Sequence, residues 1–180
     1  MKSADESPHG QAAMKSIPWL VVALAFMVTV VSFIFFWDQL PGEVASHFDL
    51  NGHADGWMSK TGFISFALVL QFGLAVMMFG FGWLIKVLPT SMINIPNREY
   101  WLADERRDQT LAESQSMMGW IAAGTAVMLM VMFYLSIEAN LGEEKRLNAT
   151  ASWVCVASYL VWLLVYCVVT LKKYYRIPSQ

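Results

Sequence analysis

The sequence predicts an all-α membrane protein with four transmembrane helices, both termini on the inner side, and one short structured outer loop. Hydrophobic residues make up 57% of the 180 residues and charged residues only 14%, whereas about a quarter of the residues of a soluble domain are charged. Four apolar runs are also long enough to cross a hydrocarbon core of about 30 Å. These runs lie at about 18–37, 62–88, 117–137 and 153–171.

We place the four runs in a single transmembrane domain, residues 17–172, because the chain is short for two domains. Residues 1–16 are polar and rich in Ser, Gly and Ala, so we expect a disordered cytoplasmic N-terminus. Residues 38–61 form the outer loop, 89–116 the inner loop and 173–180 a cytoplasmic tail. The first run is longer than the apolar stretch of about 7–15 residues in a cleaved signal peptide, so we expect it to be retained.

Basic residues predict the orientation. Nine of the twelve Lys and Arg residues fall at the termini, in the inner loop and at the adjoining helix end, and three fall in the two outer segments. The side richer in Lys and Arg is cytoplasmic in membrane proteins. Tryptophans near both ends of the runs predict a belt at each interface. The net charge of -2 argues against nucleic acid as a partner, because phosphate binding needs a basic surface. The lipid bilayer is therefore the expected environment.

The outer loop carries a hairpin signal. Asn51-Gly52 is the pair that favours a type I′ turn. Residues 44–50 alternate apolar and polar, which predicts that Phe48 and Leu50 are buried and that the opposite face is exposed.

The same loop gathers candidate metal or ligand residues: His47, Asp49, His53 and Asp55. Imidazole and carboxylate groups suit zinc, although Asx turns and backbone hydrogen bonds would also account for these residue types. A histidine with a pKa near 6.5 would alternatively sense protons. A calcium loop does not fit, because Ala54 and Lys60 stand where that motif needs glycine and glutamate. We predict no cofactor.

The inner loop is the second candidate surface. We expect Asp104 to cap a helix that runs into the third span, and Tyr100 and Trp101 to lie at headgroup level. The loop is either a solvated connector at the interface or a docking surface for a cytoplasmic protein. The docking candidates are Asn94, Pro96, Asn97, Arg98, Tyr100, Trp101, Arg106 and Arg107.

The spans offer little chemistry. Gln71 is the only strongly polar side chain deep in a run, so a transporter would need Gln71, Thr125 and Ser158 to line one water-filled cavity. No nucleophile–base set or H-E-x-x-H motif is present, so we expect no enzyme activity. Cys155 and Cys167 lie about 18 Å apart if that run is helical, too far for a disulfide.

Part of the outer loop resembles a bacterial family. The residues that carry the likeness are Pro41, Phe48, Gly52, Gly56, Trp57, Ser59 and Lys60, together with His47 and Asp55. This run is similar to the domain of unknown function that opens SdpI-type (sporulation-delaying-protein immunity) membrane proteins. Ala45 departs from the pattern, where a proline is usual, and so does Met58, where glycine is common. The R-T-P-W-T-like signature of the immunity module is absent from this sequence.

The resemblance implies a multi-pass protein of the bacterial inner membrane. We therefore expect non-enzymatic envelope sensing, signalling or peptide-toxin immunity, with a peptide or protein ligand outside and a cytoplasmic protein partner inside. A small transporter or transporter subunit, a metal-binding membrane protein and a homo-oligomer remain open alternatives.

Overall fold

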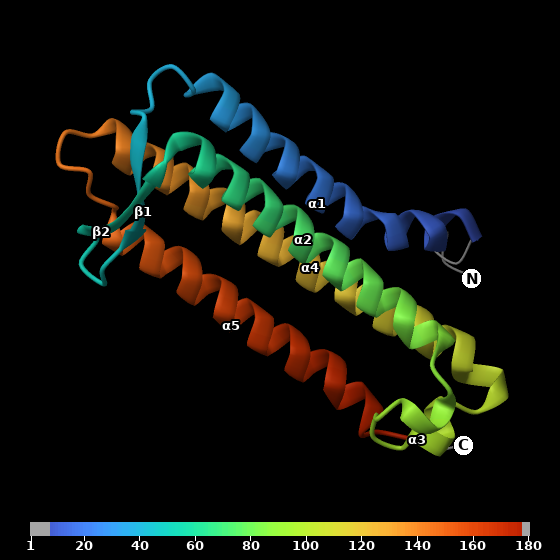
Figure 1. Cartoon of the computed structure of the whole chain (residues 1–180). Coiled ribbons are helices and arrows are strands. Elements are labelled where there is room, and N and C mark those ends of the chain that lie inside the picture. The colour runs from blue at the N-terminus through green and yellow to red at the C-terminus, as the bar shows by residue number, and fades with distance from the viewer. Residues whose placement is uncertain (1–7, 178–180) are drawn as a thin grey trace.

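A computed structural model describes residues 8–177 of the chain and shows four long helices and one β-hairpin (Figure 1). The helices are α1 (Pro8–Phe35), α2 (Lys60–Val87), α4 (Asp104–Leu141) and α5 (Ala149–Tyr174). Each contains a stretch long and apolar enough to cross a membrane. The predicted class, a four-helix multi-pass membrane protein with a small hairpin in its first loop, is therefore confirmed.

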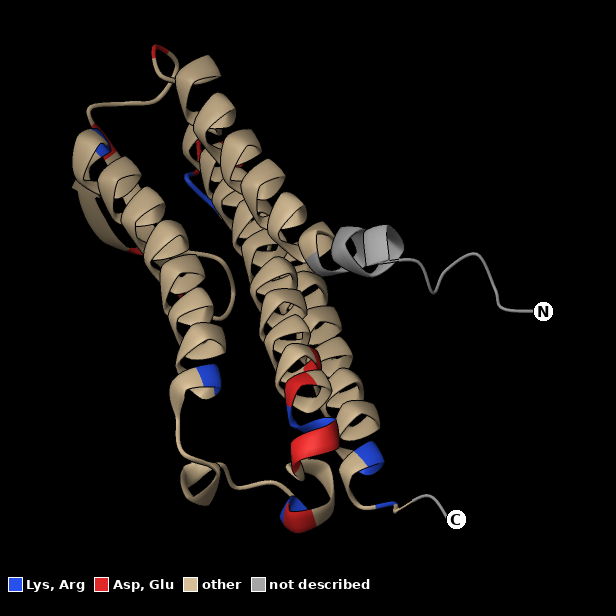
Figure 2. Cartoon of the chain, turned by 90° about the vertical axis from the view of Figure 1, so that its right-hand side faces the viewer, with Lys and Arg blue, Asp and Glu red and all other residues tan. Residues whose placement is uncertain are grey.

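The two ends of the bundle differ in what they carry. The hairpin and the connector before α5 lie at one end, which we call the hairpin end (Figure 1). The start of α1, the short helix α3 (Arg98–Trp101) and the end of α5 lie at the other, the α3 end. Charged residues gather near the two ends, and the helix lengths between them carry almost none (Figure 2). This pattern is what a bilayer-spanning bundle requires, because charge at the bilayer centre is costly.

Each of the four helices begins before its predicted span, and the difference is largest for α1 and α4. α1 begins at Pro8, so residues 8–16 are helical where disorder was expected; residues 1–7 lie outside the described residues. Proline suits a first helical position, and the Gln, Ala, Met and Lys residues that follow are good helix formers. α4 takes in residues 104–116 of the expected inner loop and 138–141 of the expected connector.

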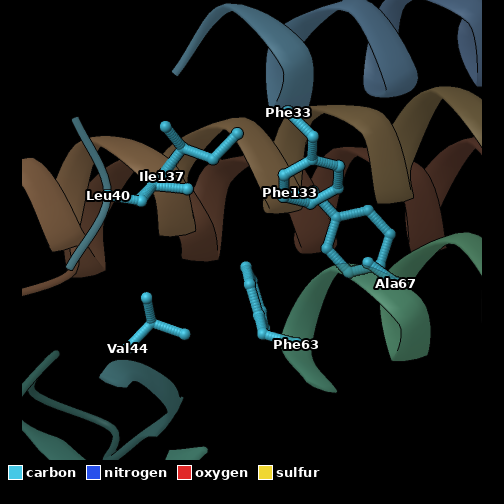
Figure 3. Packing of buried hydrophobic residues seen from close by; sticks show 7 residues of the cluster. All are labelled: Phe33, Leu40, Val44, Phe63, Ala67, Phe133 and Ile137. Atoms are coloured by element: carbon cyan, nitrogen blue, oxygen red, sulfur yellow. The ribbon is translucent and has the colours of Figure 1, made fainter. Parts of the chain in front are cut away.

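Three helices and the hairpin share one apolar cluster near the hairpin end (Figure 3). The rings of Phe33 on α1, Phe63 on α2 and Phe133 on α4 lie within 6.4 Å of one another, centroid to centroid. Val44 closes the cluster from the hairpin and is fully buried. The hairpin is thus part of the core.

α5 is the least embedded helix. None of its most hydrophobic stretch is buried, whereas 28% of the corresponding stretch of α4 is. α1 and α4, by contrast, approach closely over a cluster of small side chains, because alanine lets two backbones come together. That cluster comprises Val22, Ala25, Ala122, Ala123 and Ala126.

Candidate functional site

The hairpin pairs β1 (Glu43–Phe48) with β2 (Ala54–Ser59) in antiparallel register, with a bulge between Ala45 and His47. The bulge breaks the two-residue alternation of the strand. Val44 and Ala45, just before the bulge, are both fully buried.

Asn140, near the end of α4, fixes the hairpin at this bulge. Its Oδ1 accepts the amide N–H of Ala45 at 2.8 Å, and its Nδ2 donates to the carbonyl of Ala45 at 2.9 Å and to that of Ser136 at 2.9 Å. Asn140 is 0% exposed. One side chain thereby satisfies both backbone groups of a buried residue, which would otherwise cost free energy. The resembled family usually has proline at position 45, and proline has no N–H to donate. Ala45 supplies the N–H that Asn140 accepts in this chain.

The turn at the tip differs from the predicted type I′. A type I′ turn requires positive φ at both central residues, but Gly52 alone has it, at +86°, and Asn51 does not. The amide of Gly52 donates to the carbonyl of Asp49 at 3.0 Å, and the side chain of Asp49 accepts the amides of Asn51 and His53, both at 2.8 Å. Asp49 therefore organises the turn, as the Asx-turn alternative predicted.

The prediction that Leu50 is buried is wrong. Leu50 is 74% exposed, because β1 ends at Phe48 and the turn takes Leu50 out of the strand alternation. Its carbonyl accepts the Nε1–H of Trp153 on α5 at 3.2 Å. The carbonyl of Gly52 accepts the amide of Leu147 at 2.9 Å. The tip is thus tied to the connector and to α5.

Several residues of the family-like motif have structural roles. Lys60 Nζ donates to the carbonyls of Trp37 at 2.8 Å and Leu40 at 3.2 Å, just beyond the end of α1. Ser59 caps α2 by accepting the amide of Gly62 at 3.1 Å. A Cβ on Gly56 would lie 2.8 Å from that of His47. The motif therefore describes how the loop is built.

The four candidate ligand residues form two separate pairs. His47 Nδ1 lies 2.5 Å from Asp55 Oδ1, and His53 Nδ1 lies 3.2 Å from Asp49 Oδ2. Within residues 8–177, no three His, Cys, Asp or Glu side chains come together in a group that could hold a metal ion. The predicted four-residue metal site is not assembled in this arrangement.

The Asp49 pairing gives a pH prediction. The hydrogen bond from the amide of His53, aided by its ring and by the amide of Asn51, holds the pKa of Asp49 below its ordinary value of 3.8. A lowered carboxylate pKa stabilises the fold above the unfolded-state pKa, and this contribution is lost as pH falls through the folded-state value. We expect hydrogen exchange at the amides of Asn51 and His53, corrected for intrinsic rates, to lose protection below pH 3.8.

Asp49→Asn is the matched comparison, because it removes the titration and keeps an acceptor oxygen. Asp38→Asn, at an exposed position of the same loop, should behave as wild type. Identical pH profiles for wild type and Asp49→Asn would contradict the prediction.

At the α3 end, two of the docking candidates hold α5. Asn97 Nδ2 and Trp101 Nε1 both donate to the carbonyl of Tyr174, at 2.9 and 3.1 Å. The rings of Trp101 and Tyr174 meet edge to face at 5.6 Å, and both residues are buried. Trp101, expected at headgroup level, is therefore inside the protein.

Other inner-loop residues also make contacts within the chain. Arg106 donates to the carbonyl of Tyr100 at 2.9 Å and lies over its ring, and Arg98 donates to the carbonyl of Ser91 at 3.2 Å. The helix-capping prediction is wrong: Ala103 occupies the N-cap of α4, and Asp104 is its first residue. A first-turn carboxylate still suits the helix dipole.

A shallow groove of about 430 Å³ remains on this surface, beyond the short 3₁₀ helix η2 (Thr90–Met92). Its lining comprises Asn94, Ile95, Asn97, Arg98, Glu99, Tyr100 and Ile177. Pro96 and Arg107 are not part of this lining; Arg107 donates to the carbonyl of Leu88 at 3.4 Å.

The polar residues of the spans face different neighbours. Gln71 is buried, and its Nε2 donates to the carbonyl of Ala126 on α4 at 3.0 Å. The hydroxyl of Thr125 pairs with that of Tyr159 at 2.7 Å, and Ser158 lines an apolar groove between α4 and α5. The three predicted transporter residues thus have different surroundings, and neither Gln71 nor Thr125 lines the groove of Ser158.

Comparison with known proteins gives one match. Residues 20–72 match the model of a family described as a domain of unknown function (DUF1648). The match covers most of α1, the whole hairpin and the first half of α2. Nothing among the curated proteins or the solved structures matches the chain. The chain is therefore similar, over residues 20–72, to a domain whose function is not known.

Proposed function

We propose that this chain is a non-enzymatic bacterial inner-membrane protein whose hairpin recognises a peptide or protein at the outer face, in envelope sensing or peptide-toxin immunity. The observation that carries the proposal is the exposed face of the hairpin. The side chains of His47 and Asp55 are 75% and 48% exposed while paired with each other, and Trp57 is 49% exposed.

This face stands on a fixed support. Asn140 holds the bulge, Lys60 holds the base and the connector holds the tip. Asp55 and Trp57 alternate outward along β2, and Asp55 reaches across to His47 on β1. A preorganised surface loses little conformational entropy on binding, and exposed tryptophans are enriched among residues that dominate binding energy.

The choice of ligand class rests on two further features. The outer loop resembles that of SdpI-type immunity proteins, which supports a secreted peptide as the ligand. The groove beside Arg98 and Tyr100 at the α3 end supports a cytoplasmic protein partner, as signalling would require. The excess of Lys and Arg in the inner loop and at the termini supports an orientation with the hairpin outside.

The test is a survival assay in a bacterial strain that lacks the chain and is complemented with variants. Cells are challenged with the secreted peptide fraction of the source organism's own culture. We expect Trp57→Ala to raise the chain's dissociation constant for the peptide about thirtyfold, which corresponds to about 2 kcal/mol for a binding hot spot, and to reduce survival accordingly.

Gly42→Ala is the control, because a Cβ at that loop position meets nothing within 4 Å, and it should survive as wild type does. Equal survival and equal envelope-stress responses with and without the chain would refute both branches of the proposal. Equal survival of wild type and Trp57→Ala would refute the role of the hairpin face.

A further inference from the structure

We infer that a groove along α5 binds one anionic phospholipid from the leaflet at the α3 end, with an acyl chain against α4 and α5 and the phosphate beside Lys172. The groove lies between α4 and α5, with Val21 of α1 also in its lining. Its volume is about 420 Å³, and its lining is almost wholly apolar. On α4 the lining runs from Trp120 to Val131, and on α5 from Cys155 to Trp162. These stretches belong to the membrane spans.

The groove continues toward the α3 end. A second hollow of about 730 Å³ follows α5 from Ala157 to Val169 and shares Ser158 and Trp162 with the first. Its floor includes the stacked rings of Trp162 and Tyr166, with centroids 5.4 Å apart. From Cys155 to Val169, fourteen residues of helix rise about 21 Å. The second hollow is lined by α5 alone, so the two together form an apolar track along this helix.

A basic side chain stands where the groove ends. Residues three and four apart share a helix face, so Lys172 follows Val169 on the groove side of α5. Lys172 is exposed and has no ion-pair partner among the residues that the structure describes. Its neighbour Lys173 is instead paired with Glu113. An apolar groove that ends at a free cation complements a lipid with hydrocarbon tails and a negative headgroup.

Contacts at both ends and near the middle of α5 hold it in place beside this groove. At the hairpin end, Trp153 is bonded to the carbonyl of Leu50, and at the α3 end the carbonyl of Tyr174 accepts Asn97 and Trp101. Between these ties, the Trp162 ring already occupies the space over Gly124, where a Cβ would lie 2.4 Å from it. α5 is thus held by hydrogen bonds at both ends and by the packing of Trp162 against Gly124 near its middle.

The chemistry of the lining indicates what fills the space. Water does not stably occupy an apolar hollow that offers it no hydrogen-bond partners. A hydrocarbon chain needs no hydrogen bonds, and the nearby Lys172 attracts a negative headgroup, so a lipid satisfies both features at once. Occupation by a second copy of the chain is an outcome that the test below distinguishes.

The test is native mass spectrometry of the full chain released from nanodiscs of phosphatidylglycerol or of phosphatidylcholine. We expect one phosphatidylglycerol molecule to be retained per wild-type chain. Val127→Trp fills the groove from α4, and Ser158→Phe fills it from α5; each should lower retention at least tenfold. Lys172→Gln should lower retention about fivefold, as expected for one cation near an anionic headgroup.

Matched controls separate the groove from general effects. Val69→Trp places the same ring at a 71% exposed position of α2, and Lys86→Gln removes a basic residue from the last turn of α2; both should retain lipid as wild type does. Circular dichroism identifies any variant that fails to fold. If one of the two filling variants does not fold, lipid retention by the other one tests the inference. Equal retention in the filling variants and Val69→Trp, equal retention of the two lipids, or lipid-free dimers would overturn the inference.

Discussion

Replacing Asn140 by leucine is expected to release the hairpin from the bundle and to destabilise the protein by about 3 kcal/mol or more. The side chain makes two hydrogen bonds to the backbone of Ala45, and both residues are fully buried. Leucine leaves the N–H and C=O of Ala45 without partners, and each unsatisfied buried group costs about 1–3 kcal/mol. Thermal unfolding in detergent measures the loss, and hydrogen exchange at the Ala45 amide locates it.

Glu138→Leu provides the control, because it introduces the same side chain two residues away at an exposed position of α4. Asn140→Asp separates the two bonds, since a carboxylate can still accept the amide of Ala45 but cannot donate to its carbonyl. We expect Asn140→Asp to be destabilised as well. A melting curve of Asn140→Leu that overlays that of Glu138→Leu would show that the two hydrogen bonds between Asn140 and Ala45 contribute nothing to stability.

Replacing Gly52 by alanine should have the second largest effect, a loss of about 2–4 kcal/mol. The left-handed backbone at φ +86° costs a residue with a side chain about 1–2 kcal/mol. A Cβ at Gly52 would also lie 2.2 Å from the carbonyl oxygen of Leu147. The connector must therefore move, which breaks the hydrogen bond from the Leu147 amide to the Gly52 carbonyl.

The same loop contains its own control. Gly42→Ala adds the same methyl group where nothing lies within 4 Å, and its φ is not positive. Both variants can be compared by thermal unfolding and by exchange at the Leu147 amide. Gly52→Ala should expose that amide, and Gly42→Ala should not. If both variants melt together with wild type, the tip is not anchored in the way the geometry implies.

The four spans could be predicted because the bilayer imposes length and hydropathy directly on the sequence. The hairpin was also predictable, since its strands and its Asn-Gly tip are local signals. The exposure of Leu50 was not predictable, because a bulge and a longer turn interrupt the alternation of the strand. No local sequence pattern predicts a bulge of this kind.

The role of Asn140 could not be predicted from the sequence, for a different reason. It lies in what reads as a charged connector after the third apolar run, and only the extension of α4 to Leu141 brings it to Ala45, 95 residues away in sequence. Trp101 was predicted at the lipid headgroups because interfacial tryptophans are common. Trp101 instead donates to the carbonyl of Tyr174, 73 residues away in sequence. The residues around Trp101 give no sign of such a distant partner.

The length of α4 has a mechanical consequence. Asn140 ties one end of this helix to the hairpin, and Thr110, near the other end, donates to the carbonyl of Trp101 at 2.8 Å. Thirty residues of continuous helix separate these two attachments by about 45 Å. If α4 moves as a rigid rod, a tilt of about 5° around its midpoint displaces each attachment by about 2 Å, in opposite directions. Force applied at one face of the membrane would then reach the other through a single lever, with no relay of rearranging side chains.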